Sequence, residues 1–177
     1  MISRSQHVLL LTGAPGVGKT TVIRRVADSL AGRRLAGFYT EEIRADGSRQ
    51  GFRLTTFDGR EIVMAHVDLP KHDRLGKYGV DVAAIDNIVE KALRLDEEPD
   101  IYLIDEIGKM ECLSERFVRA VRQILDYKKP VVATVSQQGA GLIAAVKRRQ
   151  DTELWEVTRA NRDELAAAIV AWLGFGR

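Results

Sequence analysis

Residues 8–20 read VLLLTGAPGVGKT, and this stretch decides the fold. Val8–Thr12 is an apolar run bounded by Gly13, which is typical of a strand buried on both faces of a sheet. Apolar residues then recur at helical spacing from Val22 to Leu30, and Gly32 is positioned to end that helix. The sequence therefore predicts a strand, a glycine-rich turn and a helix in direct succession.

The glycine-rich turn matches the phosphate-binding pattern G-x-x-x-x-G-K-[ST] in full. Its glycines let successive backbone N–H groups point at phosphate oxygens, and the positive end of the following helix adds to the attraction. Lys19 supplies a charge between the β- and γ-phosphates, and Thr20 offers a hydroxyl to Mg²⁺. The residues expected to bind the nucleotide here are Gly13, Ala14, Pro15, Gly16, Val17, Gly18, Lys19, Thr20 and Thr21.

A second motif begins at Ile101, where the apolar run to Ile104 is followed by Asp105 and Glu106. An apolar strand that ends in a carboxylate brings Asp105 to the sheet edge that carries the phosphate loop, where it would hold Mg²⁺ through water. Glu106 is then placed to polarise a water in line with the γ-phosphate. Runs of this kind are common, and the phosphate loop is what gives this one its weight. Together the two motifs favour hydrolysis over passive binding.

A different pattern covers residues 37–66, where we expect an antiparallel meander attached to the main sheet. Its strands are separated by Asp46-Gly47 and Asp58-Gly59, and Asp-Gly is a hairpin signal because both turn positions need positive φ. Gly76 and Gly79, on either side of Tyr78, indicate a loop, and Tyr78 would either pack or stack on a base. Elsewhere apolar strands alternate with amphipathic helices, which predicts an α/β fold with a mainly parallel sheet covered on both sides.

Composition limits the remaining possibilities. A chain of 177 residues suits one buried core, so we expect a single domain over 1–177. Its 27 basic and 25 acidic residues leave a net charge of +2, so we expect neither nucleic acid nor membrane as a partner. Cys112 stands alone, which excludes an internal disulfide and fits a reducing compartment. No stretch approaches the ~20 apolar residues of a membrane span, and we expect a cytoplasmic location.

Five segments in order, spread over nearly the whole chain, carry a resemblance to a known family. They are GAPGVGKTT (Gly13–Thr21), GFYTEEIR (Gly37–Arg44), Tyr78-Gly79-Val80, DEIGKME (Asp105–Glu111) and TRANRD (Thr158–Asp163). Together they resemble the thermophile-type nucleoside-triphosphatase family, whose animal member is called cancer-related nucleoside triphosphatase. The resemblance implies a P-loop NTPase domain with a RecA-like three-layer core. It also implies slow, Mg²⁺-dependent hydrolysis of ATP, GTP, CTP and UTP to diphosphate and phosphate.

Lys109 and Arg44 are candidates for stabilising charge in the transition state. Lys109 would reach the γ-phosphate as a built-in counterpart of an arginine finger, beside Glu106 and Lys19 in the catalytic set. The alternative is that Lys109 forms an ion pair with Glu106 or with Glu111. Arg44 would either approach the same site or form a structural salt bridge.

Asn161 to Glu164 also allow two interpretations. Asn161, with Glu164 three residues later, suits a cap on the last helix. The segment is similar to the N-K-x-D guanine reader of small GTP-binding proteins, with Arg in place of Lys and Glu in place of Asp. Arg162 would then lie near the base, and we include it among the nucleotide-binding residues.

Two other functions fit the motifs. One is a kinase for a nucleotide or small molecule, for which Lys147–Arg149 is the only candidate for a basic lid. The other is a regulatory protein whose affinity for a partner depends on the nucleotide. We expect a monomer, but base preference, oligomeric state and cellular partner are not determined by these residues.

Overall fold

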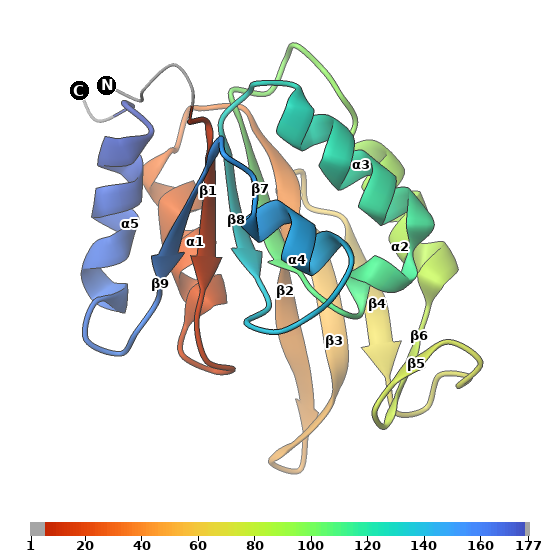
Figure 1. Cartoon of the computed structure of the whole chain (residues 1–177). Helices are drawn as coiled ribbons and strands as arrows, with labels where there is room; N and C mark the ends of the chain where they lie inside the picture. The colour runs from red at the N-terminus through yellow and green to blue at the C-terminus, as the bar shows by residue number, and fades with distance from the viewer. Residues whose placement is uncertain (1–5, 176–177) are drawn as a thin grey trace.

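The computed structural model describes residues 6–175, whose strands all belong to one nine-stranded sheet (Figure 1). The strands are β1 (Val8–Thr12), β2 (Leu35–Ala45), β3 (Ser48–Thr56), β4 (Glu61–His66), β5 (Arg74–Leu75), β6 (Tyr78–Val80), β7 (Ile101–Ile107), β8 (Val131–Val135) and β9 (Thr152–Glu156). Their order across the sheet is β5-β6-β4-β3-β2-β7-β8-β1-β9. Within that order, β2, β7, β8, β1 and β9 are parallel, and β3, β4, β6 and β5 form the antiparallel extension.

Five α-helices cover the sheet within the described residues, and none of them is long and apolar enough to cross a bilayer. They are α1 (Lys19–Ser29), α2 (Val82–Ala92), α3 (Glu115–Asp126), α4 (Leu142–Lys147) and α5 (Arg162–Trp172), with a short 3₁₀ turn, η1 (Glu111–Leu113). Helices α1 and α5 pack on one face, and α2, α3 and α4 pack on the other. The predicted three-layer fold is confirmed.

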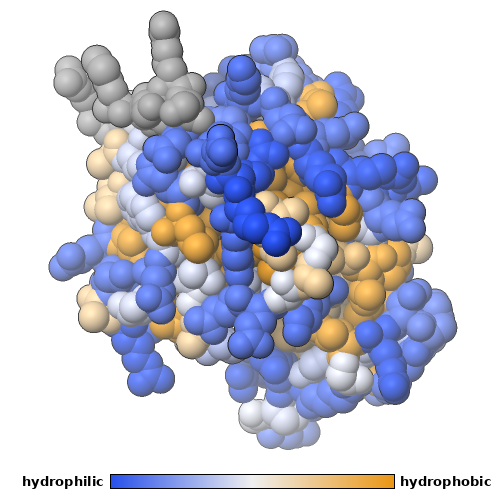
Figure 2. Space-filling view, in the orientation of Figure 1, coloured by the Kyte–Doolittle hydropathy of each residue, from blue (hydrophilic) through white to orange (hydrophobic). Residues whose placement is uncertain are grey.

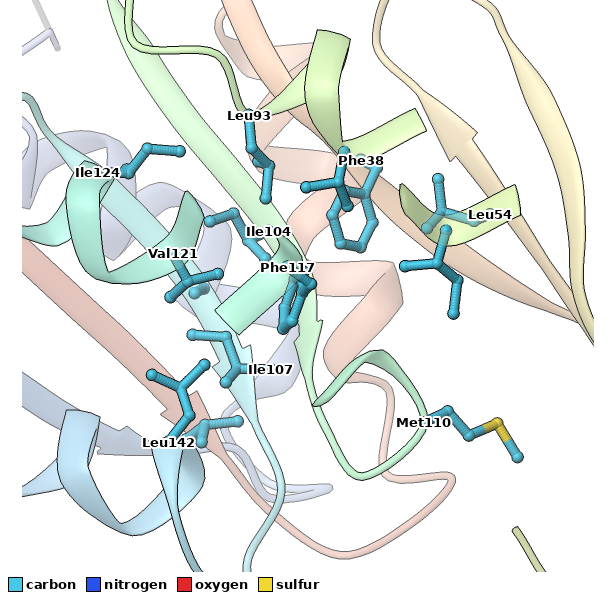
Figure 3. Close-up of a cluster of buried hydrophobic side chains, with 14 of the residues drawn as sticks. Phe38, Leu54, Leu93, Ile104, Ile107, Met110, Phe117, Val121, Ile124 and Leu142 are labelled. Carbon is cyan, nitrogen blue, oxygen red and sulfur yellow. The ribbon is translucent and has the colours of Figure 1, made fainter. Parts of the chain in front are cut away.

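Two apolar cores result because successive side chains of a strand point to opposite faces. In β1, Leu9 and Leu11 contact the helices α1 and α5, whereas Val8 and Leu10 contact the other layer. The larger core is centred on Phe38 and Phe117, whose rings are 6.2 Å apart (Figure 3). Hydrophilic residues cover most of the face seen in Figure 2, with hydrophobic residues in smaller areas between them.

The strand order places β8 between β1 and β7. Leu10 of β1 pairs with Ala133 of β8, and Ala133 pairs with Ile104 of β7, so these three residues are level across the sheet. The phosphate loop, which follows β1, and Asp105, on β7, therefore lie at the same edge of the sheet, on either side of the end of β8.

The prediction of a loop around Tyr78 is wrong, because β5 and β6 form a small hairpin there. Gly76, at φ 59°, makes its turn, and Gly79 lies so close to the chain that an added Cβ would be 2.4 Å from the carbonyl oxygen of Leu69. Tyr78 is buried, with its ring edge against Phe52 at 5.4 Å between centroids. Gly76 and Gly79, which indicated a loop, instead allow a tight turn and a close approach between two segments of the chain.

The two Asp-Gly turns differ from each other. Asp46 and Gly47 both have positive φ, 50° and 74°, as predicted for a tight hairpin. At the second turn only Gly59 does, at 90°, and Thr56 N donates to the carbonyl oxygen of Arg60 at 2.9 Å. This is the longer hairpin loop in which a single residue takes the left-handed conformation, so positive φ at Asp58 is not required.

Candidate active site

The phosphate loop is shaped by two glycines and anchored by one apolar residue. Gly16 and Gly18 have φ values of 74° and 112°, which residues with a Cβ rarely adopt. Val17 between them is buried in the core below α1. Gly18 offers no side chain to cap α1, so the first N–H groups of that helix remain available to an anion.

Lys19 lies across the inside of this loop. Its Nζ donates to the carbonyl oxygen of Gly13 at 2.8 Å and to that of Ala14 at 3.3 Å. These bonds hold the ammonium group at the centre of the curve, where the β- and γ-phosphates of a nucleotide would lie.

Asp105 is buried, with 1% of its surface exposed, and is held by three threonines from different elements. Thr20 of α1 donates its hydroxyl to Oδ2 at 2.7 Å, and Thr134 of β8 donates to Oδ1 at 2.6 Å. Thr40 of β2 donates to Oδ2 from its backbone N at 3.2 Å and its hydroxyl at 3.3 Å. The carboxylate is therefore fixed in direct contact with the phosphate-loop helix.

The strand that carries this carboxylate is longer than predicted. We expected it to end at Ile104, but β7 continues to Ile107, and its pairing with β8 shifts register between those two residues. Asp105 and Glu106 lie within this irregularity. As a result Asp105 bonds to Thr134 inside the sheet, while Glu106 Oε1 accepts a hydrogen bond from the hydroxyl of Ser136 beyond its edge, at 2.8 Å.

A second carboxyl group, that of Glu111, lies beside Glu106. A Cβ at Gly108 would be 2.7 Å from Glu111 Oε2 and 2.8 Å from Glu106 Oε1, so both carboxyl groups lie against this glycine. Burial, together with the nearby negative charges of Glu106 and Asp105, raises the pKa of Glu111 to about 8. Glu111 is therefore mainly protonated at neutral pH.

Lys109 is exposed and lines the cleft. Among residues 6–175 it forms no ion pair with Glu106 or Glu111, so that alternative for Lys109 is wrong. Arg44 does form the expected salt bridge, since its Nε donates to Glu42 at 2.8 Å. Of the two candidate cations, only Lys109 is left to face the cleft.

Asn161 occupies the N-cap position of α5 as predicted, but its side chain makes no capping hydrogen bond to the helix. Its Oδ1 accepts from the backbone N of Thr158, and its Nδ2 donates to the carbonyl oxygen of Glu156, both at 2.8 Å. The side chain closes the loop before α5 instead. Arg162 follows it and donates to the carbonyl oxygen of Val17 at 3.3 Å, so this guanidinium lies against the phosphate loop.

Two residues of the basic cluster Lys147–Arg149 make structural contacts. Lys147 Nζ donates to the carbonyl oxygens of Ser136 and Gln137 at 2.5 and 2.8 Å, and Arg149 pairs with Asp126 and Asp151. Lys147 therefore supports the loop that carries Ser136. These contacts give Lys147 and Arg149 structural roles, whereas the kinase alternative needs the cluster as a basic lid.

Most of the predicted residues line one cleft of about 790 Å³, between the phosphate loop and β3 to β5. Another cavity, of about 580 Å³, includes Leu35 and Pro99 and none of the predicted site residues. Cys112 is outside both, and burial raises the pKa of its thiol to about 11. The cleft thus gathers Lys19, Thr20, Asp105, Glu106 and Lys109 in one place.

Three residues that hold the two carboxylates were missed in the sequence, namely Thr40, Thr134 and Ser136. The signal for two of them was present, because Thr134 and Ser136 are polar residues at the end of an otherwise apolar strand. Thr40 carries no such signal, because alternating polar residues are ordinary in a meander.

Comparison with known proteins agrees with this geometry. A family model described as NTPase matches residues 8–170. The nucleoside-triphosphatase THEP1 of Thermotoga sp. (strain RQ2) is 42% identical over 170 residues, covering 96% of this chain and 97% of that protein. The crystal structure of THEP1 from the hyperthermophile Aquifex aeolicus has a TM-score of 0.84 at 35% identity, covering 94% and 98%. The solution structure of a human cancer-related nucleoside triphosphatase has a TM-score of 0.79 at 34% identity, covering 97% and 99%.

Proposed function

This chain belongs to the NTPase family, and on that premise we propose that it hydrolyses nucleoside triphosphates to the diphosphate and phosphate, with Mg²⁺, in the cleft at Asp105. The observation that carries the proposal is the 2.7 Å hydrogen bond from Thr20 Oγ1 to Asp105 Oδ2. This bond connects the phosphate-loop helix to the strand that carries the proposed catalytic carboxylates. The groups proposed to bind the phosphates and those proposed to catalyse hydrolysis are therefore adjacent.

The residues at this point fit Mg²⁺. Thr20 and Asp105 present hydroxyl and carboxylate oxygens, the hard ligands that this ion prefers. Thr20 would hold the ion directly and Asp105 would hold it through water. When bound with the substrate, Mg²⁺ would neutralise charge on the β- and γ-phosphate oxygens.

The protein's own side chains have separate tasks in the proposed reaction. The loop N–H groups and Lys19 bind the phosphates, and Lys109 stabilises charge that develops on the γ-phosphate. Glu106 orients the attacking water and takes its proton, with its carboxylate held by Ser136.

Recognition in this scheme is directed at the triphosphate, which all the substrates share. We therefore propose slow turnover of ATP, GTP, CTP and UTP with little preference among bases, by one domain acting as a monomer. Phosphate release measured for each nucleotide with Mg²⁺ and with EDTA tests this. A steep preference for GTP would instead indicate that Arg162 and its neighbours recognise the base. Activity retained in EDTA would exclude a requirement for Mg²⁺.

Replacement of Glu106 by Gln tests the role of the proposed base. The variant should bind a fluorescent nucleotide analogue as the wild type does, while phosphate release falls by ~100-fold, the scale of a general-base effect. Glu98→Gln, an exposed acid outside the cleft, serves as the control. Unchanged turnover in Glu106→Gln would remove this role, and diphosphate formed without free phosphate when an acceptor is present would indicate a kinase.

A further inference from the structure

The cleft does not end at the catalytic carboxylates. Beyond them its wall consists of four apolar side chains from four different segments: Phe52 of β3, Met64 of β4, Leu75 of β5 and Met110 after β7. We call this part the apolar recess. Phe52 and Leu75 are half-buried, and Met110 lies at the margin of the larger core, on the loop after β7 (Figure 3). Neither the triphosphate nor the reaction requires an apolar wall at this place.

The strand order shows which end of the nucleotide faces the recess. The metal-binding end of a triphosphate points from the phosphate loop after β1 towards Asp105 on β7. Strands β3, β4 and β5 lie farther in the same direction, whereas β9 and Arg162 lie on the opposite side of β1. Strands are spaced by about 4.8 Å, so the recess begins roughly 10 Å past the strand of Asp105. It is therefore on the γ-phosphate side of the site, away from the nucleoside.

The rim of the recess is charged but internally neutralised. Arg49 donates to Glu42 at 2.8 Å and to the hydroxyl of Tyr78 at 3.0 Å, and its guanidinium lies 5.1 Å from the centroid of the Phe52 ring. Glu42 also accepts from Arg44, and these bonds lower the pKa of its carboxyl group. Because Arg49, Arg44 and Glu42 satisfy one another, this side of the recess favours an uncharged occupant over an anion or a cation.

From these observations we propose that the apolar recess binds a second ligand, a small neutral molecule with one apolar ring. The ring would pack on Phe52 and Leu75, the two half-buried side chains of the wall, with the buried Met64 behind them. The inference rests on the proposed function for the position of the triphosphate, but not for the binding itself.

The two methionines of the recess make this binding measurable. Benzyl alcohol is titrated into nucleotide-free protein with ¹³C-methyl-labelled methionine, and the signals are assigned with Met64→Leu and Met110→Leu. Both signals should shift and saturate with a dissociation constant on the order of 1 mM, as expected for so small a ligand. Benzoate and benzylamine, the charged counterparts, should bind at least ~10-fold more weakly, because the recess would desolvate their charge.

Two substitutions to tryptophan locate the site. Leu75→Trp fills the recess and should abolish the saturable shift, whereas Leu154→Trp, at an exposed position on β9, should leave it unchanged. No saturation by about 20 mM, far above the expected range, would overturn the proposal. So would equal binding of the three probes, or the same constant in Leu75→Trp. Phosphate release by the unmodified protein is measured separately, so failure of the proposed hydrolysis would be recognised on its own.

Discussion

Thr134→Val tests whether the hydrogen bonds from the threonines around Asp105 position its carboxylate, or whether these residues only contribute packing. Thr134 is completely buried, and its hydroxyl is the only described hydrogen-bond donor to Asp105 Oδ1 within residues 6–175, at 2.6 Å. Valine has nearly the same shape, so the substitution removes this bond without opening a cavity. The carboxylate then keeps its donors on Oδ2 and loses its partner on Oδ1.

The expected magnitude follows from the burial and charge of this bond. A hydrogen bond to a charged group contributes about 1.5–3 kcal/mol, and the short distance and full burial place this one near the middle of that range. A loss of about 2 kcal/mol in a chain of this size lowers the melting temperature by roughly 4–8 °C. Misplacement of Asp105 should also raise the Mg²⁺ concentration for half-maximal phosphate release by ~10-fold or more.

Thr55→Val provides a matched control. Thr55 is also buried on the sheet, but its hydroxyl has no hydrogen-bond partner among the described residues. Thermal melting and Mg²⁺ titrations of both variants are compared, together with Thr134→Ser, which retains the hydroxyl. If Thr55→Val and Thr134→Val lower the melting temperature equally, or if the Mg²⁺ dependence of Thr134→Val is unchanged, the reasoning about Asp105 is refuted.

Three further predictions address other side chains of the cleft. The pKa of Glu111 is raised from 4.5 to about 8, so the folded state holds a proton that the unfolded state loses, and stability should fall as pH rises from about 4.5 to 8. Glu111→Gln should remove this slope, which is worth roughly 10 °C or more in melting curves recorded across that range. Lys109→Ala should lower kcat by ~10²-fold or more, whereas Arg44→Ala, whose guanidinium is already paired, should stay within about twofold in the same phosphate assay. Arg162→Ala should raise KM by about fivefold with little change in kcat, since one hydrogen bond to Val17 helps to shape the loop; a kcat effect alone would contradict this.

Much of the parallel half of the fold could be predicted, because its signals are local. Runs such as Val8–Thr12 and Val131–Val135 are apolar on every residue or nearly so, which only a strand covered on both faces requires. The hairpin of β5 and β6 was missed for the opposite reason. Its strands are two and three residues long, and their buried state depends on contacts such as that of Tyr78 with Phe52, which lies 26 positions earlier in the chain.

The backbone conformation of the phosphate loop was also predictable from the sequence. Gly16 and Gly18 are needed for local backbone angles, and Lys19 and Thr20 follow them at a fixed spacing, so a short motif is sufficient to indicate a phosphate loop. By contrast, Asn161 seemed suited to cap a helix from its neighbours alone. Its amide found backbone partners at Thr158 and Glu156 instead, in a loop whose path no local pattern specifies.

The sequence by itself determined the phosphate loop, the carboxylate motif and the alternation of strands and helices, because each depends on residues that are close together in the chain. Only the tertiary structure decided that β8 lies between β1 and β7, which brings Thr134 to Asp105 and Ser136 to Glu106. The tertiary structure also decided that apolar side chains of β3, β4 and β5 come together in the apolar recess. These contacts join residues that are far apart in sequence, and they depend on strand order and register, which arise when the whole sheet packs against its helices.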